Sequence, residues 1–203
     1  MFTGIVQAIG KVESLRAGPG GSKRLTIKTD FDVAAMPLGS SMAVNGACLT
    51  LVDRRKGHPS SFQADLGRET LECTTLGELV PGHRVHLEPA LRLSDMLGGH
   101  LVSGHVDGVG TVEKARKQGD MFELRVECPS DIAPFLFKKG SIAIDGVSLT
   151  INDVQTHSFE ALLIPHTVSV TLLGELRPGG KVNLEADMIA KHISRYVEKM
   201  HAK

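Results

Sequence analysis

The chain has 203 residues, and its 23 basic residues balance its 23 acidic ones. The sequence has no basic stripe that could bind a phosphate backbone, so nucleic acid is not an expected partner. No apolar run approaches the ~18 residues of a membrane helix, and the N-terminus has no signal-peptide pattern, so no membrane association is expected. The three cysteines are odd in number and widely spaced, which favours a reducing compartment, and we expect a cytoplasmic protein.

The predicted elements are short strands in which apolar and polar residues alternate. In chain order the strand-like runs are 5–11, 25–28, 61–64 and 85–88, then 124–127, 158–161 and 182–185. Glycine and proline mark a hairpin loop at 18–21 and turns at 81–82 and 178–179. One or two helical turns are expected at 32–36, 70–76, 131–135 and 167–173. Strands of this length with these turns predict small closed barrels of about six strands each.

The sequence repeats itself once, with an offset that drifts only from 100 to 97 residues. Residues 3–13 align with 103–113, 41–50 with 141–150, 76–82 with 173–179, and 85–88 with 182–185. In the third pair six of seven residues match, whereas common residues match by chance in about one position in fifteen. The repeat predicts two copies of one unit. Duplication alone could serve only to build a scaffold, and that interpretation stays open.

Boundaries follow from the repeat. We expect an N-terminal barrel at 1–97, a C-terminal barrel at 98–186, and a C-terminal helix at 187–203. In that last segment Ile189, Ile193, Tyr196, Val197 and Met200 fall on one helical face. This face either docks on its own barrel or forms a contact between subunits, and the absence of a matching helix after the first copy favours the contact.

The aligned blocks 45–50 and 145–150 are the best candidates for chemistry. An Asn-Gly or Asp-Gly pair makes a tight turn, after which Cys48 and Thr50, or Ser148 and Thr150, lie on the same strand face. Small polar side chains beside backbone groups suit hydrogen bonding to the edge of a heterocycle. A polar strand end with satisfied hydroxyls is the structural alternative, and finding the block twice favours function.

The two copies differ where reactivity would differ. Cys48 is aligned with Ser148, and a thiol is the better nucleophile. His105 is aligned with an aliphatic residue, and histidine is a natural proton shuttle near neutral pH. Asp187 is likewise aligned with Ala90. The half-sites are therefore predicted to be alike in shape and different in chemistry. No zinc spacing, phosphate loop or dinucleotide fingerprint is present.

At these residues the sequence resembles riboflavin synthase of the alpha-chain type. The resemblance covers essentially the whole chain and is carried by 1–6, 45–50, 98–105, 145–150 and 163–167. It implies an all-β fold of two tandem six-stranded Greek-key barrels, related by internal duplication, plus a C-terminal α-helix. It also implies a homotrimer assembled through those helices.

The implied reaction is a dismutation of two 6,7-dimethyl-8-ribityllumazine molecules. One gives a four-carbon unit to the other, which yields riboflavin and 5-amino-6-(ribitylamino)pyrimidinedione in the last step of riboflavin biosynthesis. No cofactor or metal is required. The site forms between the first barrel of one subunit and the second barrel of its neighbour, so two lumazine molecules and further copies of the chain are the expected partners, with lumazine synthase as an additional candidate.

The resemblance also implies the binding residues. The first half-site would contain Gly4, Ile5, Val6, Ser41, Cys48, Leu49, Thr50, Asp65, Leu66, Gly67, Arg68, Glu69 and Thr70. The second would contain Gly104, His105, Val106, Lys139, Ser148, Leu149, Thr150, Leu163, Ile164, Pro165, His166, Thr167 and Val168. The sequence departs from the family at Ala47, where some members carry a second cysteine, and at His166, where an acidic residue is common.

Four side chains are the candidate catalytic groups. His105 is the expected base or proton shuttle, and Cys48 or a water beside it the expected nucleophile. Ser148 would orient the substrate with Thr50, and Asp187 would polarise a neighbouring group. Two other functions remain open: a non-catalytic lumazine- or flavin-binding protein, and a flavin-dependent oxidoreductase domain, against which the missing nicotinamide fingerprint speaks.

Overall fold

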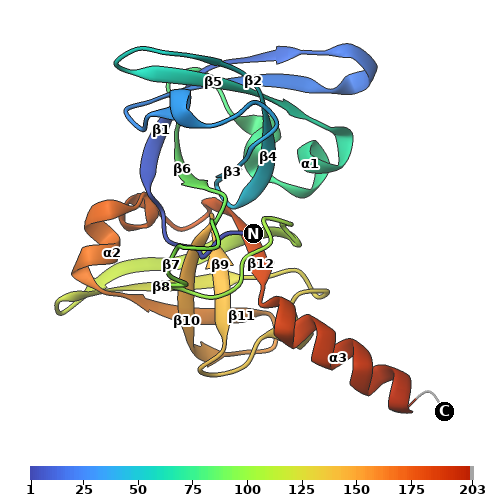
Figure 1. The fold of residues 1–203 in the computed structure, drawn as a ribbon. Helices are drawn as coiled ribbons and strands as arrows, with labels where there is room; N and C mark the ends of the chain where they lie inside the picture. Colours follow the sequence, from blue (N-terminus) through green and yellow to red (C-terminus); the bar gives the residue numbers. More distant parts are fainter. Residues whose placement is uncertain (202–203) are drawn as a thin grey trace.

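The computed structural model describes residues 1–201 and contains two closed six-stranded antiparallel barrels followed by one long helix (Figure 1). The first barrel comprises β1 (Ala8–Ala17), β2 (Lys23–Thr29), β3 (Ser41–Val44), β4 (Ala47–Arg55), β5 (Ser60–Leu66) and β6 (Arg84–Pro89). Its strands close in the order β1-β2-β5-β4-β3-β6. The predicted all-β class is confirmed.

The second barrel repeats this arrangement. It comprises β7 (Gly108–Gln118), β8 (Met121–Glu127), β9 (Ser141–Ile144), β10 (Val147–Val154), β11 (Ser158–Leu163) and β12 (Lys181–Ala186). Its order β10-β11-β8-β7-β12-β9 becomes that of the first barrel when each strand is replaced by its aligned partner. The sequence repeat is therefore a repeat of complete barrels.

Each barrel has its own apolar core, because alternate side chains along the strands point inward. The largest buried side chains include Phe62, Leu25, Ile27 and Met42 in the first barrel and Phe159, Leu124 and Ile132 in the second. A third small cluster lies between the barrels and is formed by Phe2, Ala43, Val102 and Ala143. The two barrels are thus joined by an apolar contact as well as by the chain.

Short helical turns connect the strands. They are η1 (Pro19–Gly21), η2 (Val33–Ala35), α1 (Arg68–Cys73), η3 (Thr75–Glu78), η4 (Ala133–Phe135), α2 (Pro165–Val170) and η5 (Leu173–Glu175). The turns predicted at 32–36 and 131–135 are confirmed, but each predicted second helix is two separate pieces. Thr74 and Thr171 interrupt it with extended backbone, and each hydroxyl accepts a hydrogen bond from the N–H two residues later.

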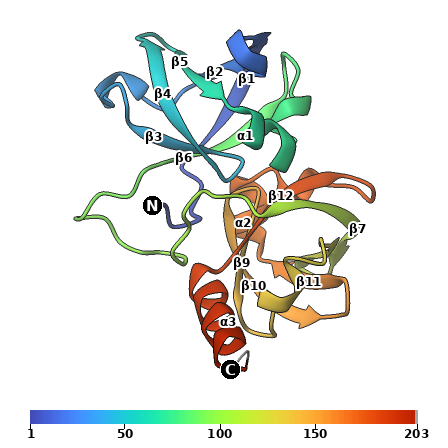
Figure 2. The same ribbon diagram turned by 90° about the vertical axis from the view of Figure 1, so that its right-hand side faces the viewer.

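The C-terminal helix α3 (Met188–His201) projects away from the second barrel in Figure 1 and is seen beside that barrel in Figure 2. Its apolar residues Ile189, Ile193, Tyr196, Val197 and Met200 remain between 42% and 67% exposed, so this face does not dock on the barrel of its own chain. The last two residues of the segment 187–203 lie outside the described residues. Among the described residues, no helix is both long and apolar enough to span a membrane.

The segments that precede the two barrels cross between them. The Phe2 N–H donates to the Val102 carbonyl at 2.7 Å, and the Val102 N–H donates to the Phe2 carbonyl at 3.1 Å. Beyond this bridge, Val6 packs against the core of the second barrel and Val106 against the core of the first. Each barrel is therefore completed by a segment that enters from the other.

A buried polar contact at the centre of the barrel interface fixes the state of His86. Its Nδ1 lies 2.8 Å from the Asp145 carbonyl and must donate, whereas Nε2 accepts from the Leu172 N–H at 2.7 Å. Only the neutral ring satisfies both partners, because a second proton on Nε2 would face the N–H group. Burial lowers the pKa of His86 to about 4.

The aligned residue of the second copy, Asn183, makes the reciprocal contacts. Its Oδ1 accepts from the Thr75 N–H at 2.8 Å, and its Nδ2 donates to the Asn45 carbonyl at 2.8 Å. The Asp145 carboxylate accepts from the Asn183 N–H at 2.8 Å, yet burial raises the pKa of Asp145 to about 7. The interface thus contains two buried groups, His86 and Asp145, whose shifted pKa values change the stability of the fold with pH in opposite directions.

His86→Asn should remove a pH-dependent contribution to stability, because asparagine serves in the aligned position of copy two. The pKa of His86 is depressed from 6.5 to about 4 in the fold, so its contribution is complete above pH 6.5 and is lost as pH falls towards 4. The stability difference between parent and variant should shrink by about 3 kcal/mol between pH 7 and pH 4. Urea unfolding at both values measures it, and a constant difference would contradict the assignment.

Asp145→Asn should behave in the opposite sense, with Asn45 as its natural precedent. The raised pKa means that the folded state holds its proton more tightly than the unfolded chain, so stability is lost as pH rises from 3.8 to about 7. The variant should therefore gain up to about 4 kcal/mol over the parent across that range. The same unfolding series tests this, and an advantage of the variant over the parent that grows as pH falls would reject it.

Gly104→Ala should destabilise the fold much more than Gly119→Ala. Both glycines have positive φ, +81° and +61°, but a Cβ at Gly104 would lie 2.6 Å from Cys48 Cβ, whereas Gly119 faces open space. Backbone strain alone should cost about 1–2 kcal/mol at Gly119, and overpacking should add about 1–3 kcal/mol at Gly104. Equal losses in urea unfolding would show that the segment can move away from Cys48.

Candidate active site

The crossing segments bring residues of both copies together at each candidate half-site. The Cys48 N–H donates to the Gly104 carbonyl at 2.8 Å, and the Ser148 N–H donates to the Gly4 carbonyl at 2.8 Å. The sequence-based grouping, which placed Gly4, Ile5 and Val6 with Cys48 and Gly104, His105 and Val106 with Ser148, is wrong. The reason is the exchange of segments, which an alignment of the copies does not reveal.

A cavity of about 570 Å³ marks the half-site beside Ser148. The first copy contributes Gly4, Ile5, Val6 and Arg84 to its lining. The second copy contributes Val147, Ser148, His166, Thr167 and Val168. Arg84 forms an ion pair with Glu175 across the barrel interface, so charge at this rim is partly neutralised. The lining is about equally polar and apolar, so the cavity offers a small molecule both hydrogen-bonding groups and apolar contact.

Five other residues predicted for this half-site do not line the cavity. Leu149 and Leu163 are buried in the barrel core, while Thr150, Ile164 and Pro165 are exposed. Pro165 begins α2, the helix that carries His166, Thr167 and Val168 to the cavity. Proline suits the first turn of a helix, which explains this local geometry.

The half-site beside Cys48 uses the aligned elements of the first copy. Cys48 is half-buried and Thr50 is exposed on β4, and β5 and α1 supply Asp65, Leu66, Gly67, Arg68, Glu69 and Thr70. Leu66 is part of the core, as is Leu49. The carboxylate of Asp65 accepts two hydrogen bonds from Arg24, at 2.7 and 2.8 Å, which lowers the pKa of Asp65 and keeps it charged.

Ser148 has a histidine partner that the sequence reasoning missed. The Nδ1 atom of His100 lies 2.7 Å from Ser148 Oγ, and within the described residues the buried Nε2 atom has no hydrogen-bond partner. Burial lowers the pKa of His100, and the charge of Asp187 opposes that shift. A neutral imidazole beside a hydroxyl can accept or return a proton.

The signal for His100 was present in the linker. A Cβ at Gly99 would lie 2.1 Å from the Thr3 carbonyl oxygen and 2.8 Å from Ser148 Cβ, so only glycine lets the linker pass this close. The adjacent Gly98-Gly99 pair therefore marked a place where the backbone packs tightly against another segment. A histidine directly after such a pair was a candidate for the site.

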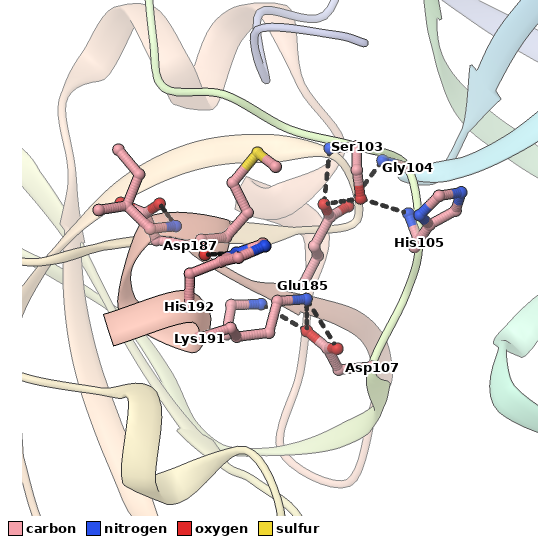
Figure 3. A network of polar contacts seen from close by, with 11 residues as sticks. Ser103, Gly104, His105, Asp107, Glu185, Asp187, Lys191 and His192 are labelled. Carbon is pink, nitrogen blue, oxygen red and sulfur yellow. Dashed lines mark hydrogen bonds and ion pairs between the residues drawn. The ribbon is translucent and has the colours of Figure 1, made fainter. Parts of the chain in front are cut away.

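Asp187 lies at the start of α3, where its Oδ1 accepts from the Ile189 N–H at 2.9 Å. This is the geometry of a helix N-cap, which gives the residue a structural role beside its electrostatic effect on His100. Figure 3 shows it in the network that leads from α3 to the crossing segment. His105 lies on that segment with its ring exposed, one residue from the carbonyl that binds Cys48.

Ser41 and Lys139 lie outside the two clusters described above. Ser41 pairs with Thr50 across β3 and β4 and lines a separate cavity of about 850 Å³ beside the linker. Lys139 is exposed in the turn before β9 and does not line the cavity at Ser148. Within the part of the chain that the structure describes, no three His, Cys, Asp or Glu side chains are grouped to hold a metal ion.

Comparison with known proteins supplies the family. The model of the lumazine-binding domain matches twice, at residues 3–90 and 103–187. Riboflavin synthase of Brucella abortus is 39% identical over 98% of both chains, and that of Mycobacterium bovis is 44% identical over 96% of this chain and 97% of the relative. Riboflavin synthase of Bacillus subtilis is 39% identical over 98% of this chain and 91% of the relative.

Two solved structures have the same fold. LumP complexed with 6,7-dimethyl-8-(1'-D-ribityl)lumazine has a TM-score of 0.80 and 27% identity over 92% of this chain and 99% of that one. LumP complexed with riboflavin has a TM-score of 0.80 and 28% identity over the same shares. Two matched domains and relatives along the full length lead to one conclusion: the chain belongs to the riboflavin synthase family of proteins with paired lumazine-binding domains.

Proposed function

We propose that this chain converts two molecules of 6,7-dimethyl-8-ribityllumazine into riboflavin and 5-amino-6-(ribitylamino)pyrimidinedione by transfer of a four-carbon unit. The observation that carries the proposal is the pair of half-sites with equivalent backbone geometry and different reactive groups. Cys48 and His105 belong to one, and Ser148 and His100 to the other. Two identical substrates need two similar binding pockets. Transfer of a four-carbon unit needs one substrate to act as donor and the other as acceptor.

Both proposed reactive groups belong to the Cys48 half-site, and with the two substrates stacked they act on different rings. A methyl group on one lumazine loses a proton, for which His105 is the proposed base, and the other ring accepts a nucleophile, for which Cys48 or a water beside it is proposed. Ser148, held by His100, and Thr50 orient the rings. Stacking the two substrates in register makes the encounter local, which can supply up to about 7–11 kcal/mol of the barrier. Residues 1–97 and 98–186 are the two lumazine-binding units in this proposal, each completed by the crossing segment of the other.

A second chain completes the site in this proposal. The cavity at Ser148 is lined by residues 4–9 and 147–148, Arg84, Glu175 and α2 with its following residues, and by none of residues 48–50 or 65–70. The exposed apolar face of α3 supports an assembly through residues 187–203, which the proposal takes to be a trimer. Three free cysteines support a reducing compartment, taken here as the cytoplasm, and lumazine synthase remains a candidate partner.

A non-catalytic lumazine-binding protein is the second candidate function. The likeness to LumP in complex with a lumazine and with riboflavin favours it, since that fold accommodates these ligands. The two functions separate on product formation, because a binding protein retains the lumazine unchanged.

Purified protein should consume two lumazine molecules for each riboflavin formed, without any additive. Cys48→Ala and His105→Gln should each lower turnover by about 100-fold or more, the range expected for loss of a nucleophile or a general base. The measurement is lumazine loss against riboflavin gain by absorbance. Bound lumazine without riboflavin would support the second candidate, and unchanged turnover in either variant would remove that residue from the mechanism.

Charge on the apolar face of α3 should dissociate the assembly. The variant Ile193→Glu with Tyr196→Glu places two carboxylates on that face and should convert a trimer into a monomer, with loss of turnover. Light scattering after size exclusion gives the mass. Arg195→Glu on the same helix is the matched control and should remain trimeric, and a monomeric parent with full turnover would contradict the two-chain site.

A further inference from the structure

Two glutamates occupy aligned positions at the ends of the barrels and bind the crossing segments. Glu88 on β6 accepts hydrogen bonds from the Thr3 N–H and the Thr3 hydroxyl, each at 2.7 Å, and from the Gly4 N–H at 3.0 Å. The Thr3 hydroxyl also accepts from the Ile5 N–H at 3.3 Å. One carboxylate thus fixes three consecutive residues of the first segment.

Glu185 on β12 repeats these contacts in the second copy (Figure 3). It accepts from the Ser103 N–H and the Ser103 hydroxyl, each at 2.7 Å, and from the Gly104 N–H at 3.0 Å. The Ser103 hydroxyl in turn accepts from the His105 N–H at 3.2 Å. The chain of contacts leads from Glu185 to the backbone of the candidate base.

Both glutamates are buried: Glu88 is 6% exposed and Glu185 is 2% exposed. Burial raises the pKa of each, and the hydrogen bonds from the segment oppose that shift. A buried carboxyl group costs stability unless its oxygens accept hydrogen bonds, and the donors described above all come from the crossing segments. A pair of apolar residues would fill the same space, so the contacts point to a role in holding the segments in place.

The segments held in this way form walls of the half-sites. Gly104 accepts from the Cys48 N–H and Gly4 from the Ser148 N–H, both at 2.8 Å. A shift of the second segment would therefore move His105 relative to Cys48, and a shift of the first would move residues 4–6 relative to Ser148. Each glutamate acts on the half-site of the barrel opposite to its own.

We propose that Glu88 and Glu185 are positioning residues for the reaction, Glu185 for the Cys48 half-site and Glu88 for the Ser148 half-site. The part of the proposal that concerns turnover rests on the proposed function. The crossed pattern is its distinctive feature, because a general loss of stability would affect both half-sites alike.

The α3 helix is linked to the second of these segments. Lys191 donates to both carboxylate oxygens of Asp107, at 2.9 and 3.0 Å, and Asp107 accepts from the Ala186 N–H next to Glu185. The aligned residue in the first copy is Gln7, which has no charge to offer. The Cys48 half-site is therefore also connected to the helix proposed to join the subunits.

The experiment uses the reactivity of Cys48 as a local reporter in the full-length chain. Glu185→Gln places an amide NH₂ against a backbone N–H, and Ser103→Ala removes one hydroxyl from the same contacts. Iodoacetamide labelling of Cys48 is measured by peptide mass spectrometry relative to Cys73 in the same sample. Both variants should raise the Cys48 to Cys73 ratio by about tenfold, the size expected when a hydrogen bond is lost from a local opening equilibrium.

Glu88→Gln is the matched comparison and should leave the labelling ratio of the parent unchanged while it lowers turnover. Glu185→Gln and Glu88→Gln should each lower turnover by about 10–100-fold through misplacement. Glu123→Gln, at a buried carboxylate on β8 that binds Lys114 and Arg116, should alter neither readout.

Two outcomes would overturn the proposal. The first is an equal change of the Cys48 to Cys73 labelling ratio in Glu185→Gln and Glu88→Gln. The second is a ratio equal to that of the parent in both Glu185→Gln and Ser103→Ala. Where Glu185→Gln shows no cooperative thermal transition, Ser103→Ala decides alone. If the parent forms no riboflavin, the proposed function fails, and the labelling ratio still decides whether Glu185 positions the segment at Cys48.

Discussion

The reciprocal crossing of residues 1–7 and 101–107 is the constraint on which the site depends. Each segment leaves its own copy, passes the Phe2–Val102 bridge and packs on the opposite barrel. Two glycines with positive φ permit the close approach, and two buried carboxylates hold the backbone on either side. Because both half-sites need both copies, neither barrel carries a complete half-site on its own.

The duplicated geometry fixes shape and leaves chemistry free to differ. The carbonyls of Gly4 and Gly104 accept equivalent bonds at 2.8 Å, yet one receives its bond from a serine and the other from a cysteine. Ser148 is further bound by His100, which comes from the linker and therefore exists only once. A donor and an acceptor cradle can arise in this way from one ancestral pocket, by changes to a few side chains on an unchanged backbone.

The sequence was sufficient for the fold because the repeat and the strand periodicity are local signals. The two barrels, the turns at 32–36 and 131–135, and α3 all follow from such patterns. The pairing of half-sites was not predictable, because alignment shows that residues 4–6 and 104–106 are equivalent but not which barrel each contacts. His100 was missed because its partner Ser148 is distant in the chain. Lys139 is exposed in the single chain and stays a prediction that rests on the resemblance.

The central claim is that a working site takes the Cys48 half from one chain and the Ser148 half from another. Subunit complementation tests it most directly. Chains with Cys48→Ala and chains with Ser148→Ala are each purified, shown to be defective, dissociated, mixed and reassembled. Mixed assemblies contain some interfaces with both halves intact, so riboflavin formation should rise well above that of either variant alone. If mixing restores nothing while mixed assemblies are present by mass, the two halves act within one chain and the account is contradicted.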